Sequence, residues 1–343
     1  MGKAGHGVIM RERRSPAARC RRIQGCQCAS MTKCRPPERC FWHPDWRPST
    51  RSRTSCNRWE SGHDPGQQPC WSGEVIKSYL INMQRSGDRL QAMSARLDAL
   101  GLPFERIAAV DGATLTDEQI ADFVRERPLE GSGDAFSTGP RKWTASNIGC
   151  FLSHQAAWRI AADSDDAYTA IFEDDMHLSD ALPALLRSTD WLPGGNSIVR
   201  LEPSYNRIKL DAKVADVAGR HLRLVRPSRY QHCWPVCAGA LIISRDAARL
   251  LLAAKARWHT MADIFLFGWS ESPVAHQLST YQLSPAACIQ DKFFHAAAEN
   301  IVFTSTIDAP LTHAQKQRST HWKARATALL RVAQGYRKVV FAP

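Results

Sequence analysis

Apolar residues recur with two different periods in the first regular part of the chain. The run VIKSYLINM at 75–83 is apolar and rich in β-forming residues, and it predicts a buried strand. Residues 85–102, RSGDRLQAMSARLDALGL, repeat their apolar positions at helical spacing, and Gly101 provides the helix stop. FERIAAVDG at 104–112 predicts a second strand that ends in a turn. A strand, a helix and a strand in this order predict a βαβ unit within a parallel sheet.

The alternation of helices and strands continues further along the chain. Residues 113–145 are polar and contain PLEGSGDAFSTGP, which predicts a mobile loop that closes over a ligand. The stretch SNIGCFLSHQAAWRIAADSDD predicts a helix with Ser146 or Asn147 as its N-cap, and AYTAIF after it predicts a buried strand. We therefore predict an α/β fold with a mostly parallel central sheet over residues 74–310.

Polar residues gather where the first two predicted strands end. Asn82, Arg85, Arg89 and Asp111 fall at or just beyond these ends. Ligands of parallel sheets bind at the carboxyl ends of the strands, so these four residues are candidates for a ligand site. Asp111 has an alternative role as the acceptor of an Asx turn, and arginines in the first turns of a helix also form ordinary solvated faces.

Three carboxylates, Glu173, Asp174 and Asp175, directly follow the strand AYTAIF. One interpretation is an exposed acidic turn or a helix cap. The other is a cation site, because clustered carboxylates at a strand end repel one another unless a cation neutralises them. Hard oxygen ligands suit Mg²⁺ or Mn²⁺, and such an ion typically bridges substrate phosphates and stabilises a departing diphosphate.

The two ends of the chain differ in composition from its middle. The net charge is +12, its positive surplus lies in residues 1–73 and 311–343, and residues 1–73 also contain 7 of the 11 cysteines. Because residues 1–73 show no helical or strand period, we predict a disordered basic extension, or sequence upstream of the true start. Their cysteines lack the close pairs typical of a zinc site, and a chain without a secretory apolar region is not expected to form disulfides.

The tail from 311 to 343 predicts a basic amphipathic helix. Its apolar positions, which include Trp322, Leu329 and Leu330, fall on one helical face among basic residues. Such a helix either lies on an anionic membrane surface or packs on the catalytic domain.

Four blocks of the sequence together resemble glycosyltransferase family 25. The blocks are VIKSYLINMQRSGDRLQAM with LGLPFERIAAVDG, then IGCFLSHQAAW, AIFEDDMHL and GALIISRDAARLL, in the family's order. The family contains bacterial lipooligosaccharide galactosyltransferases and the galactosyltransferases that modify collagen hydroxylysine. The resemblance implies a GT-A-like fold, a nucleotide-sugar donor, usually UDP-galactose, and inversion at the anomeric carbon.

The resemblance also implies roles for individual residues. EDD is similar to the family's version of the DxD metal motif, which makes Asp175 a direct ligand of Mn²⁺ or Mg²⁺. Glu173 then lies near the ribose or reaches the metal through water, and Asp174 turns back to hold the loop. The predicted donor-binding residues are Asn82, Arg85, Arg89, Asp111, His154 and Glu173.

Ser153 and His154, in the block GCFLSHQAAW, invite comparison with a nucleophile and its base. Adjacent residues on a helix point about 100° apart, so the pair cannot act together on one substrate atom. His154 therefore contacts the donor, supports the EDD loop or serves packing. Family members usually carry Glu where this chain has Asn147, so a charged contact at this position would be missing.

Inversion by direct displacement requires a base that takes the proton of the acceptor hydroxyl. Asp263, in HTMADIFLF, matches the family's late aspartate and is the first candidate, with a structural cap as the alternative. Glu271 is a weaker candidate. His295 is either a late metal ligand or a loop histidine, and Gly239 is expected to allow close backbone approach near the acceptor cleft.

We therefore predict a glycosyltransferase that moves a hexose, with galactose preferred, from a UDP-sugar to a saccharide or lipid-linked saccharide of the cell envelope. The expected location is the cytoplasm, with peripheral contact to the inner membrane. A nucleic-acid-binding protein is one alternative, but the basic residues are scattered and no nucleic acid is expected. A metal-dependent phosphohydrolase is another alternative, and it would use the same EDD cluster.

Overall fold

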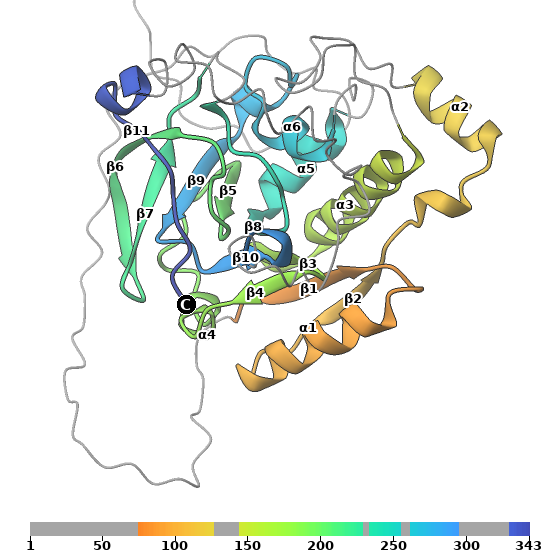
Figure 1. The fold of residues 1–343 in the computed structure, drawn as a ribbon, viewed down its shortest axis with the longest axis horizontal. Helices are drawn as coiled ribbons and strands as arrows, with labels where there is room; N and C mark the ends of the chain where they lie inside the picture. Colours follow the sequence, from red (N-terminus) through yellow and green to blue (C-terminus); the bar gives the residue numbers. More distant parts are fainter. Residues whose placement is uncertain (1–74, 127–143, 229–232, 255–260, 295–328) are drawn as a thin grey trace, which may run out of the picture. The chain divides into compact units, whose positions relative to one another are not determined.

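The computed structural model describes residues 75–126, 144–228, 233–254, 261–294 and 329–343 (Figure 1). All of them belong to one compact unit, Pro69–Pro343. The predicted extension, residues 1–73, lies outside the described ranges, so its disorder stays a prediction.

Within the described ranges, nine strands form one sheet in the order β11-β6-β7-β9-β5-β8-β3-β1-β2. A second sheet pairs β4 with β10 next to the exit of β3. The strands are β1 (Lys77–Asn82), β2 (Glu105–Ala108), β3 (Tyr168–Glu173), β4 (Met176–Leu178), β5 (Ser197–Arg200), β6 (Ile208–Val217), β7 (Arg220–Val225), β8 (Ala240–Ser244), β9 (Ser279–Ser284), β10 (Cys288–Gln290) and β11 (Tyr336–Arg337).

Most strands of the large sheet point in one direction. β1 is parallel to both β2 and β3, and β5 is parallel to β9. β8 runs antiparallel between β3 and β5, β7 runs antiparallel between β9 and β6, and β11 runs antiparallel beside β6. The predicted mostly parallel sheet is confirmed in its strand directions, and the three reversed strands are features that the sequence pattern did not predict.

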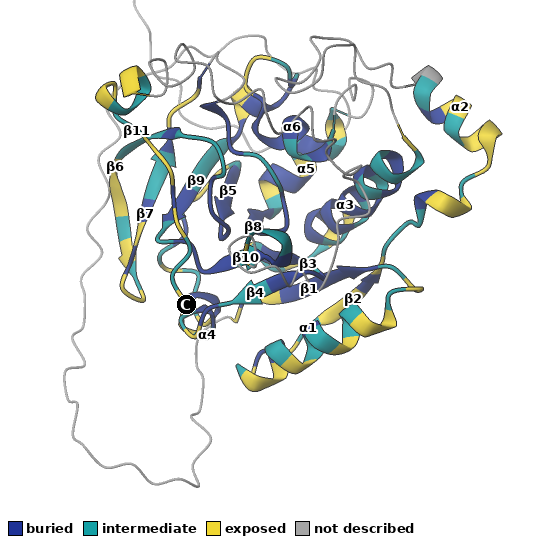
Figure 2. Cartoon of the chain, viewed as in Figure 1, coloured by how far each residue is buried: buried dark blue, intermediate teal, exposed yellow. Residues whose placement is uncertain are grey.

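Helices cover both faces of the sheet, with α1 on one face and α3, α5 and α6 on the other (Figure 1). The helices are α1 (Gly87–Ala99), η1 (Gly112–Thr114), α2 (Asp117–Glu126), α3 (Ala145–Asp163), α4 (Leu182–Leu186), α5 (Arg245–Ala253), α6 (Ala262–Phe267), η4 (Ala275–Gln277) and α7 (Asp291–Phe294). Successive strand residues point to opposite faces, so Leu80 belongs to the core under α1 and Ile81 to the core under α3. β1 and β3 are therefore buried on both faces of the sheet (Figure 2).

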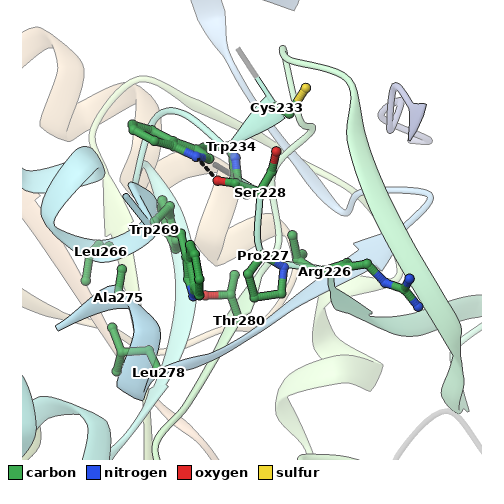
Figure 3. A pocket seen from close by; sticks show the side chains of 13 residues that line it. Arg226, Pro227, Ser228, Cys233, Trp234, Leu266, Trp269, Ala275, Leu278 and Thr280 are labelled. Atoms are coloured by element: carbon green, nitrogen blue, oxygen red, sulfur yellow. Dashed lines mark hydrogen bonds between the residues drawn. The ribbon is translucent and has the colours of Figure 1, made fainter. Parts of the chain in front are cut away.

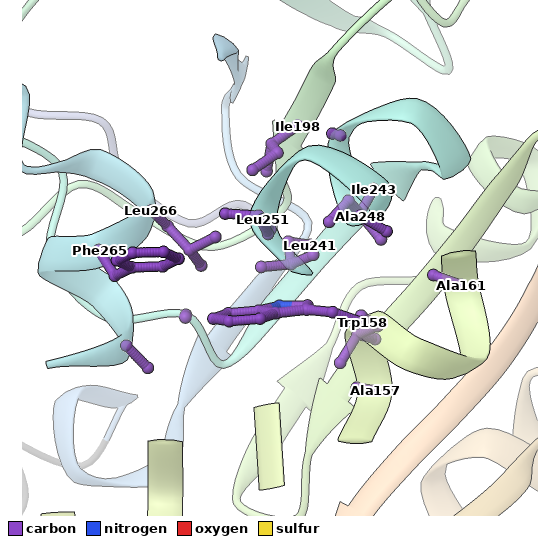
Figure 4. Packing of buried hydrophobic residues seen from close by; sticks show 14 of the residues in the cluster. Ala157, Trp158, Ala161, Ile198, Leu241, Ile243, Ala248, Leu251, Phe265 and Leu266 are labelled. Atoms are coloured by element: carbon purple, nitrogen blue, oxygen red, sulfur yellow. The ribbon is translucent and has the colours of Figure 1, made fainter. Parts of the chain in front are cut away.

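The core between α3, α5 and α6 is built around Trp158 (Figure 4). Its indole ring is fully buried and stacks on Phe265 of α6 with ring centroids 5.8 Å apart. Leu241 of β8 and Leu251 of α5 lie beside it. Aromatic rings contribute the largest buried areas in a core, so this contact fixes α3 against the sheet. His154 lies one helical turn before Trp158, and its position is fixed with it.

The prediction of a loop over residues 113–145 is wrong for its first part. η1 and α2 occupy this region, whereas 127–143 lie outside the described residues. Thr116 and Gln119 form a reciprocal capping pair, since each side chain accepts a hydrogen bond from the backbone N–H of the other. Phe123 is buried at 6 % exposure and attaches α2 to the core. The polar composition concealed this short amphipathic helix.

The predicted N-cap of α3 is also wrong. Thr144 is the cap, because its hydroxyl oxygen accepts the backbone N–H of Asn147 at 3.2 Å. Both Ser146 and Asn147 lie inside the helix. The adjacent predictions of the helix itself and of the strand AYTAIF are confirmed by α3 and β3.

The end of the chain packs on the sheet. β11 pairs with β6, and the backbone of Phe341 bridges to Ala286. Val339 is buried, whereas Leu329 and Leu330 are exposed. Packing on the domain is thus observed from Tyr336 onward, while residues 311–328 of the predicted tail helix lie outside the described residues. Within the described ranges, every helix is too short or too polar to cross a membrane.

Candidate functional site

The acidic turn between β3 and β4 is anchored from two sides. The backbone N–H of Glu173 donates to Gly239 O at 2.7 Å, which ties the end of β3 to the start of β8. The carbonyl oxygen of Asp175 accepts the backbone N–H of Asp291 at 2.7 Å, and β4 then pairs with β10. The turn therefore holds its carboxylates at the carboxyl end of a central strand, where ligands of such sheets bind.

The three carboxylates of this turn have different partners. Glu173 Oε1 lies 2.8 Å from His154 Nε2. Asp174 accepts hydrogen bonds from Asn82 Nδ2 at 2.7 Å and from Arg89 Nη1 at 3.2 Å, which confirms that it turns back to hold the loop. Asp175 Oδ1 is buried and has no hydrogen-bond partner in the part of the chain that the structure describes. Asp175 thus keeps one carboxylate oxygen available for a ligand.

Burial and mutual repulsion set the charges in this turn. Burial, together with the charges of Glu173 and Asp174, raises the pKa of Asp175 to about 7. Burial opposes the charged forms of Glu173 and His154 too, but their contact outweighs it. The hydrogen bonds of His154 to Cys150 and Glu173 raise the pKa of His154 to about 10, and the pKa of Glu173 falls below its ordinary value. His154 and Glu173 therefore form an ion pair in which the His154 side chain is buried and the Glu173 side chain is 27 % exposed.

A cavity of about 110 Å³ opens beside the turn. Its lining joins the carboxylates to several of the residues predicted from strand ends. The lining includes Arg85, Arg89, Asp111, His154, Glu173 and Asp175. Arg85, exposed, forms a salt bridge with Asp111, and this contact holds the pKa of Asp111 below its usual range. Asp111 also accepts the backbone N–H of Ala113 at 3.0 Å, so the suggested Asx-type turn is present.

Asn82 does not line this cavity. Its side chain is buried and donates to Asp174 and to the carbonyl oxygen of Ser86, while its own carbonyl oxygen accepts from Arg106 Nε at 3.0 Å. The structure therefore places Asn82 behind the turn, where it positions Asp174. Its predicted contact with a nucleoside stays a prediction.

Ser153 has a structural role in α3. Its hydroxyl group donates to Gly149 O at 2.7 Å and accepts the backbone N–H of Val110 at 2.9 Å. The hydroxyl thus attaches the helix to the segment after β2. Because the hydroxyl group is engaged with the backbone, and because adjacent helical residues point in different directions, Ser153 is excluded as a nucleophile paired with His154.

Asp263 lies in the first turn of α6, outside the cavity lining. Its carboxylate accepts the backbone N–H of Ile264 at 2.8 Å and of Cys237 at 3.1 Å. Cys237 adopts a left-handed backbone conformation with φ of 67°, which is unusual for a residue with a side chain. These contacts give Asp263 a structural role in the first turn of α6, but the N-cap of the helix is Met261, so the cap considered as the alternative is wrong. The role of Asp263 as a base stays a prediction. Glu271 follows α6 and also lies outside the cavity lining, and His295 falls outside the described residues.

Gly239 lies where several site residues converge. A Cβ atom there would be 2.8 Å from Gln290 Nε2, 2.9 Å from Met176 Sδ and 3.3 Å from Glu173 Oε2. The predicted close approach at Gly239 is confirmed. Next to it, Glu202 accepts the backbone N–H of Gly239 at 2.8 Å, and this fully buried carboxyl group was missed by the sequence reasoning. The sequence signal was weak, because Glu202 stands two residues after a four-residue strand without an acidic neighbour.

A second cavity lies at the far end of β7, between Trp234, Trp269 and Leu278 (Figure 3). It is small, about 30 Å³, and its lining among the described residues contains no carboxylate or histidine. Trp234 Nε1 donates to the carbonyl oxygen of Ser228. The described lining therefore offers no carboxylate for a cation, and the candidate site is the one beside the acidic turn.

Comparisons with known proteins show which family the sequence resembles. The sequence profile of the family described as glycosyltransferase family 25 (LPS biosynthesis protein) matches residues 75–266. The chain is 27 % identical over 227 residues to the lacto-N-neotetraose biosynthesis glycosyltransferase LgtB of Neisseria gonorrhoeae, covering 63 % of this chain and 75 % of that protein. It is also 27 % identical over 225 residues to the lipooligosaccharide biosynthesis protein lic2B of Haemophilus influenzae, covering 62 % and 76 %.

A third relative matches over a shorter stretch. A glycosyltransferase 25 family member of Anopheles gambiae is 37 % identical over 98 residues, which are 29 % of this chain and 16 % of that protein. Among solved structures, the inositol-1-phosphate CTP transferase of T. maritima aligns over 64 % of this chain and 90 % of its own, with 8 % identity and a TM-score of 0.32. The family match includes the acidic turn, α3 and Asp263, and it covers more than half of the sequence. The chain therefore belongs to glycosyltransferase family 25 and is a glycosyltransferase.

Proposed function

We propose that this enzyme transfers a hexose, with galactose preferred, from a UDP-sugar to a saccharide of the cell envelope, with inversion and with the help of Mn²⁺ or Mg²⁺. The observation that carries the proposal is the unpartnered Asp175 Oδ1 in a turn whose other carboxylates are engaged. A buried carboxylate oxygen beside an arginine-lined cavity suits a hard cation and a diphosphate.

The residues present fit a divalent cation. Asp175 would be a direct ligand, and Glu173 would act on the cation through water or from its Oε2 side, since Oε1 is held by His154. When bound, the cation supplies positive charge to the diphosphate leaving group. Within the chain, Arg85 and Arg89 line the same cavity and would add charge at the phosphates. Asp111 lies at the cavity rim and would contact the nucleoside.

Two further parts of the proposal rest on the family. A GT-A-like nucleotide-sugar-binding fold is supported by the α/β sheet and by the carboxylates at the end of β3. The names of LgtB and lic2B refer to lacto-N-neotetraose and lipooligosaccharide biosynthesis, which supports an envelope saccharide, free or lipid-linked, as the acceptor. Such an acceptor would place the enzyme in the cytoplasm, with its basic C-terminal segment at the inner membrane.

Calorimetric titration with UDP-galactose, with and without Mn²⁺, tests this proposal. We expect binding to require the cation in the wild-type protein and to weaken at least about tenfold in Asp175→Asn, because the amide cannot carry the ligand charge. Asp180→Asn, an exposed aspartate on the following turn, is the matched control and should bind like the wild type. Equal affinity with and without Mn²⁺ would remove the metal from the mechanism.

A further inference from the structure

Three buried polar atoms near the acidic turn have no hydrogen-bond partner in the described part of the chain. They are Glu202 Oε2, the Tyr205 hydroxyl and Gln290 Oε1. Glu202 is fully buried, Gln290 is 4 % exposed, and Tyr205 is half-buried with its hydroxyl group inside. Native proteins rarely leave several such atoms unpaired at one place, because each has lost its bonds to water without replacement.

These atoms belong to one cluster around Gly239. Glu202 Oε1 accepts the backbone N–H of Gly239, and the Gln290 side chain lies against the same glycine. The Tyr205 hydroxyl lies close enough to the carboxyl group of Glu202 and to the backbone N–H of Gln290 for both to affect its pKa. The charges of Glu173 and Asp175 in turn act on Glu202. The cluster therefore adjoins the proposed cation site.

The guanidinium group of Arg200 lies next to Glu202 but forms its hydrogen bonds with other groups. Arg200 Nη2 lies 3.8 Å from Glu202 Oε1, beyond hydrogen-bond distance. The guanidinium group donates instead to the carbonyl oxygens of Val236 and Cys237, at 2.9 and 2.6 Å. Burial raises the pKa of Glu202 to about 8, so at neutral pH its carboxyl group carries a proton and can donate as well as accept.

We propose that Glu202, Tyr205 and Gln290 form the subsite for the hydroxyl groups of the transferred sugar. Carboxyl, phenol and amide groups close to the proposed cation site offer donors and acceptors of the kind that the several hydroxyl groups of a hexose require. This inference rests on the proposed function, since it assigns the sugar part of the same donor. Entry past Tyr205 is part of the proposal, because its half-buried side chain, which stacks on Phe293 with centroids 3.6 Å apart, is the most exposed of the three.

Binding of UDP and of UDP-sugars to the full chain tests the subsite. Titrations use UDP, UDP-galactose and UDP-glucose with Mn²⁺ on the wild type and on Tyr205→Phe and Glu202→Gln. Both substitutions keep the shape of the side chain: Tyr205→Phe removes the hydroxyl group, and Glu202→Gln replaces the carboxyl group by an amide. We expect one wild-type UDP-sugar to bind more tightly than UDP, and each variant to weaken that UDP-sugar roughly 3- to 10-fold while UDP changes less than about twofold. Tyr336→Phe, on β11 at the far edge of the sheet, is the matched control.

A second readout separates binding from a purely structural role. Tyr205→Phe removes an unsatisfied buried hydroxyl, so the melting temperature of the ligand-free variant should equal or exceed that of the wild type. A lower melting temperature, or equal losses for UDP and UDP-sugar, would overturn the subsite. So would a wild type that binds UDP-sugars no more tightly than UDP. If the wild type fails to bind UDP at all, the proposed function falls first and the subsite with it.

Discussion

Replacing Gly149 by alanine tests whether α3 must touch the backbone at the edge of the cavity. A Cβ atom at Gly149 would lie 2.6 Å from Val110 O and 2.8 Å from Gly112 N. Both distances are shorter than normal van der Waals contacts, and neither backbone atom can rotate away as a side chain would. Val110 and Gly112 line the cavity from one side, while Cys150 and His154 of α3 line it from the other. The methyl group would therefore push the two walls apart.

Two opposing effects decide the magnitude of this change. Alanine is favoured over glycine inside a helix by about 1 kcal/mol. Overpacking a tight site costs about 1–3 kcal/mol and occasionally more, and rigid backbone neighbours put this site at the upper end. We therefore expect the free energy of unfolding of Gly149→Ala to fall by about 2 kcal/mol. UDP affinity should fall as well, because the segment from Val110 to Gly112 moves relative to His154.

Urea denaturation followed by circular dichroism measures the stability change, and calorimetry measures UDP affinity. Gly87→Ala is the matched control, since Gly87 is also helical and a Cβ atom there would meet nothing within 4 Å. The control should be stabilised by up to about 1 kcal/mol. If Gly149→Ala proved as stable as Gly87→Ala and bound UDP normally, the close contact between α3 and the cavity edge would be refuted.

Four other predictions concern the ionisable groups. Because the pKa of Asp175 is raised to about 7, its charged form predominates only above that pH, so Mn²⁺-dependent UDP affinity should rise between pH 6 and 8; a flat profile in calorimetry would contradict this. By the same shift the folded state binds more protons than the unfolded state between pH 4 and 7, and this group should lower stability as the pH rises through that window. His154→Ala removes a fully buried side chain and the partner of Glu173, whose side chain is 27 % exposed, and should lower the free energy of unfolding by about 3 kcal/mol in urea denaturation; a loss below about 1 kcal/mol would mean that the pair is solvated. Asp263→Asn should retain UDP binding and abolish transfer if Asp263 is the base; an active variant would leave it with a structural role in the first turn of α6.

Local patterns in the sequence predicted the first βαβ unit, α3 and the acidic turn, because each depends on residues close together along the chain. The spacing of Leu90, Met93 and Leu97 and the stop at Gly101, with φ of 64°, are sufficient for α1. The capping pair Thr116 and Gln119 is a similar local signal for α2, but the polar composition of the surrounding stretch led to the prediction of a loop. The direction of β8 could not be predicted, since it depends on which strands it meets in space.

The residues that were missed depend on contacts between distant segments. Glu202 follows β5 and Gln290 ends β10, and neither has a neighbour in sequence that indicates a site. Both lie against Gly239, which directly precedes β8, and β8 lies between β3 and β5 in the sheet. The hydrogen bond between Asn82 and Asp174 could not be predicted from the sequence either. The sequence pattern places both residues at strand ends, but only the fold shows that they contact each other.

The partners of the acidic turn explain how three adjacent carboxylates stand side by side, with Asp174 and Asp175 buried. His154 neutralises Glu173, and Arg89 with Asn82 stabilises Asp174. Asp175 receives no such partner from the described residues, and its raised pKa shows that part of the population avoids the charge by keeping a proton. A cation that binds Asp175 must therefore displace this proton, so metal binding and deprotonation are linked. The fold thus provides partners for two carboxylates, and the third would be compensated by the cation that we propose, which is the arrangement expected if donor and cation bind together.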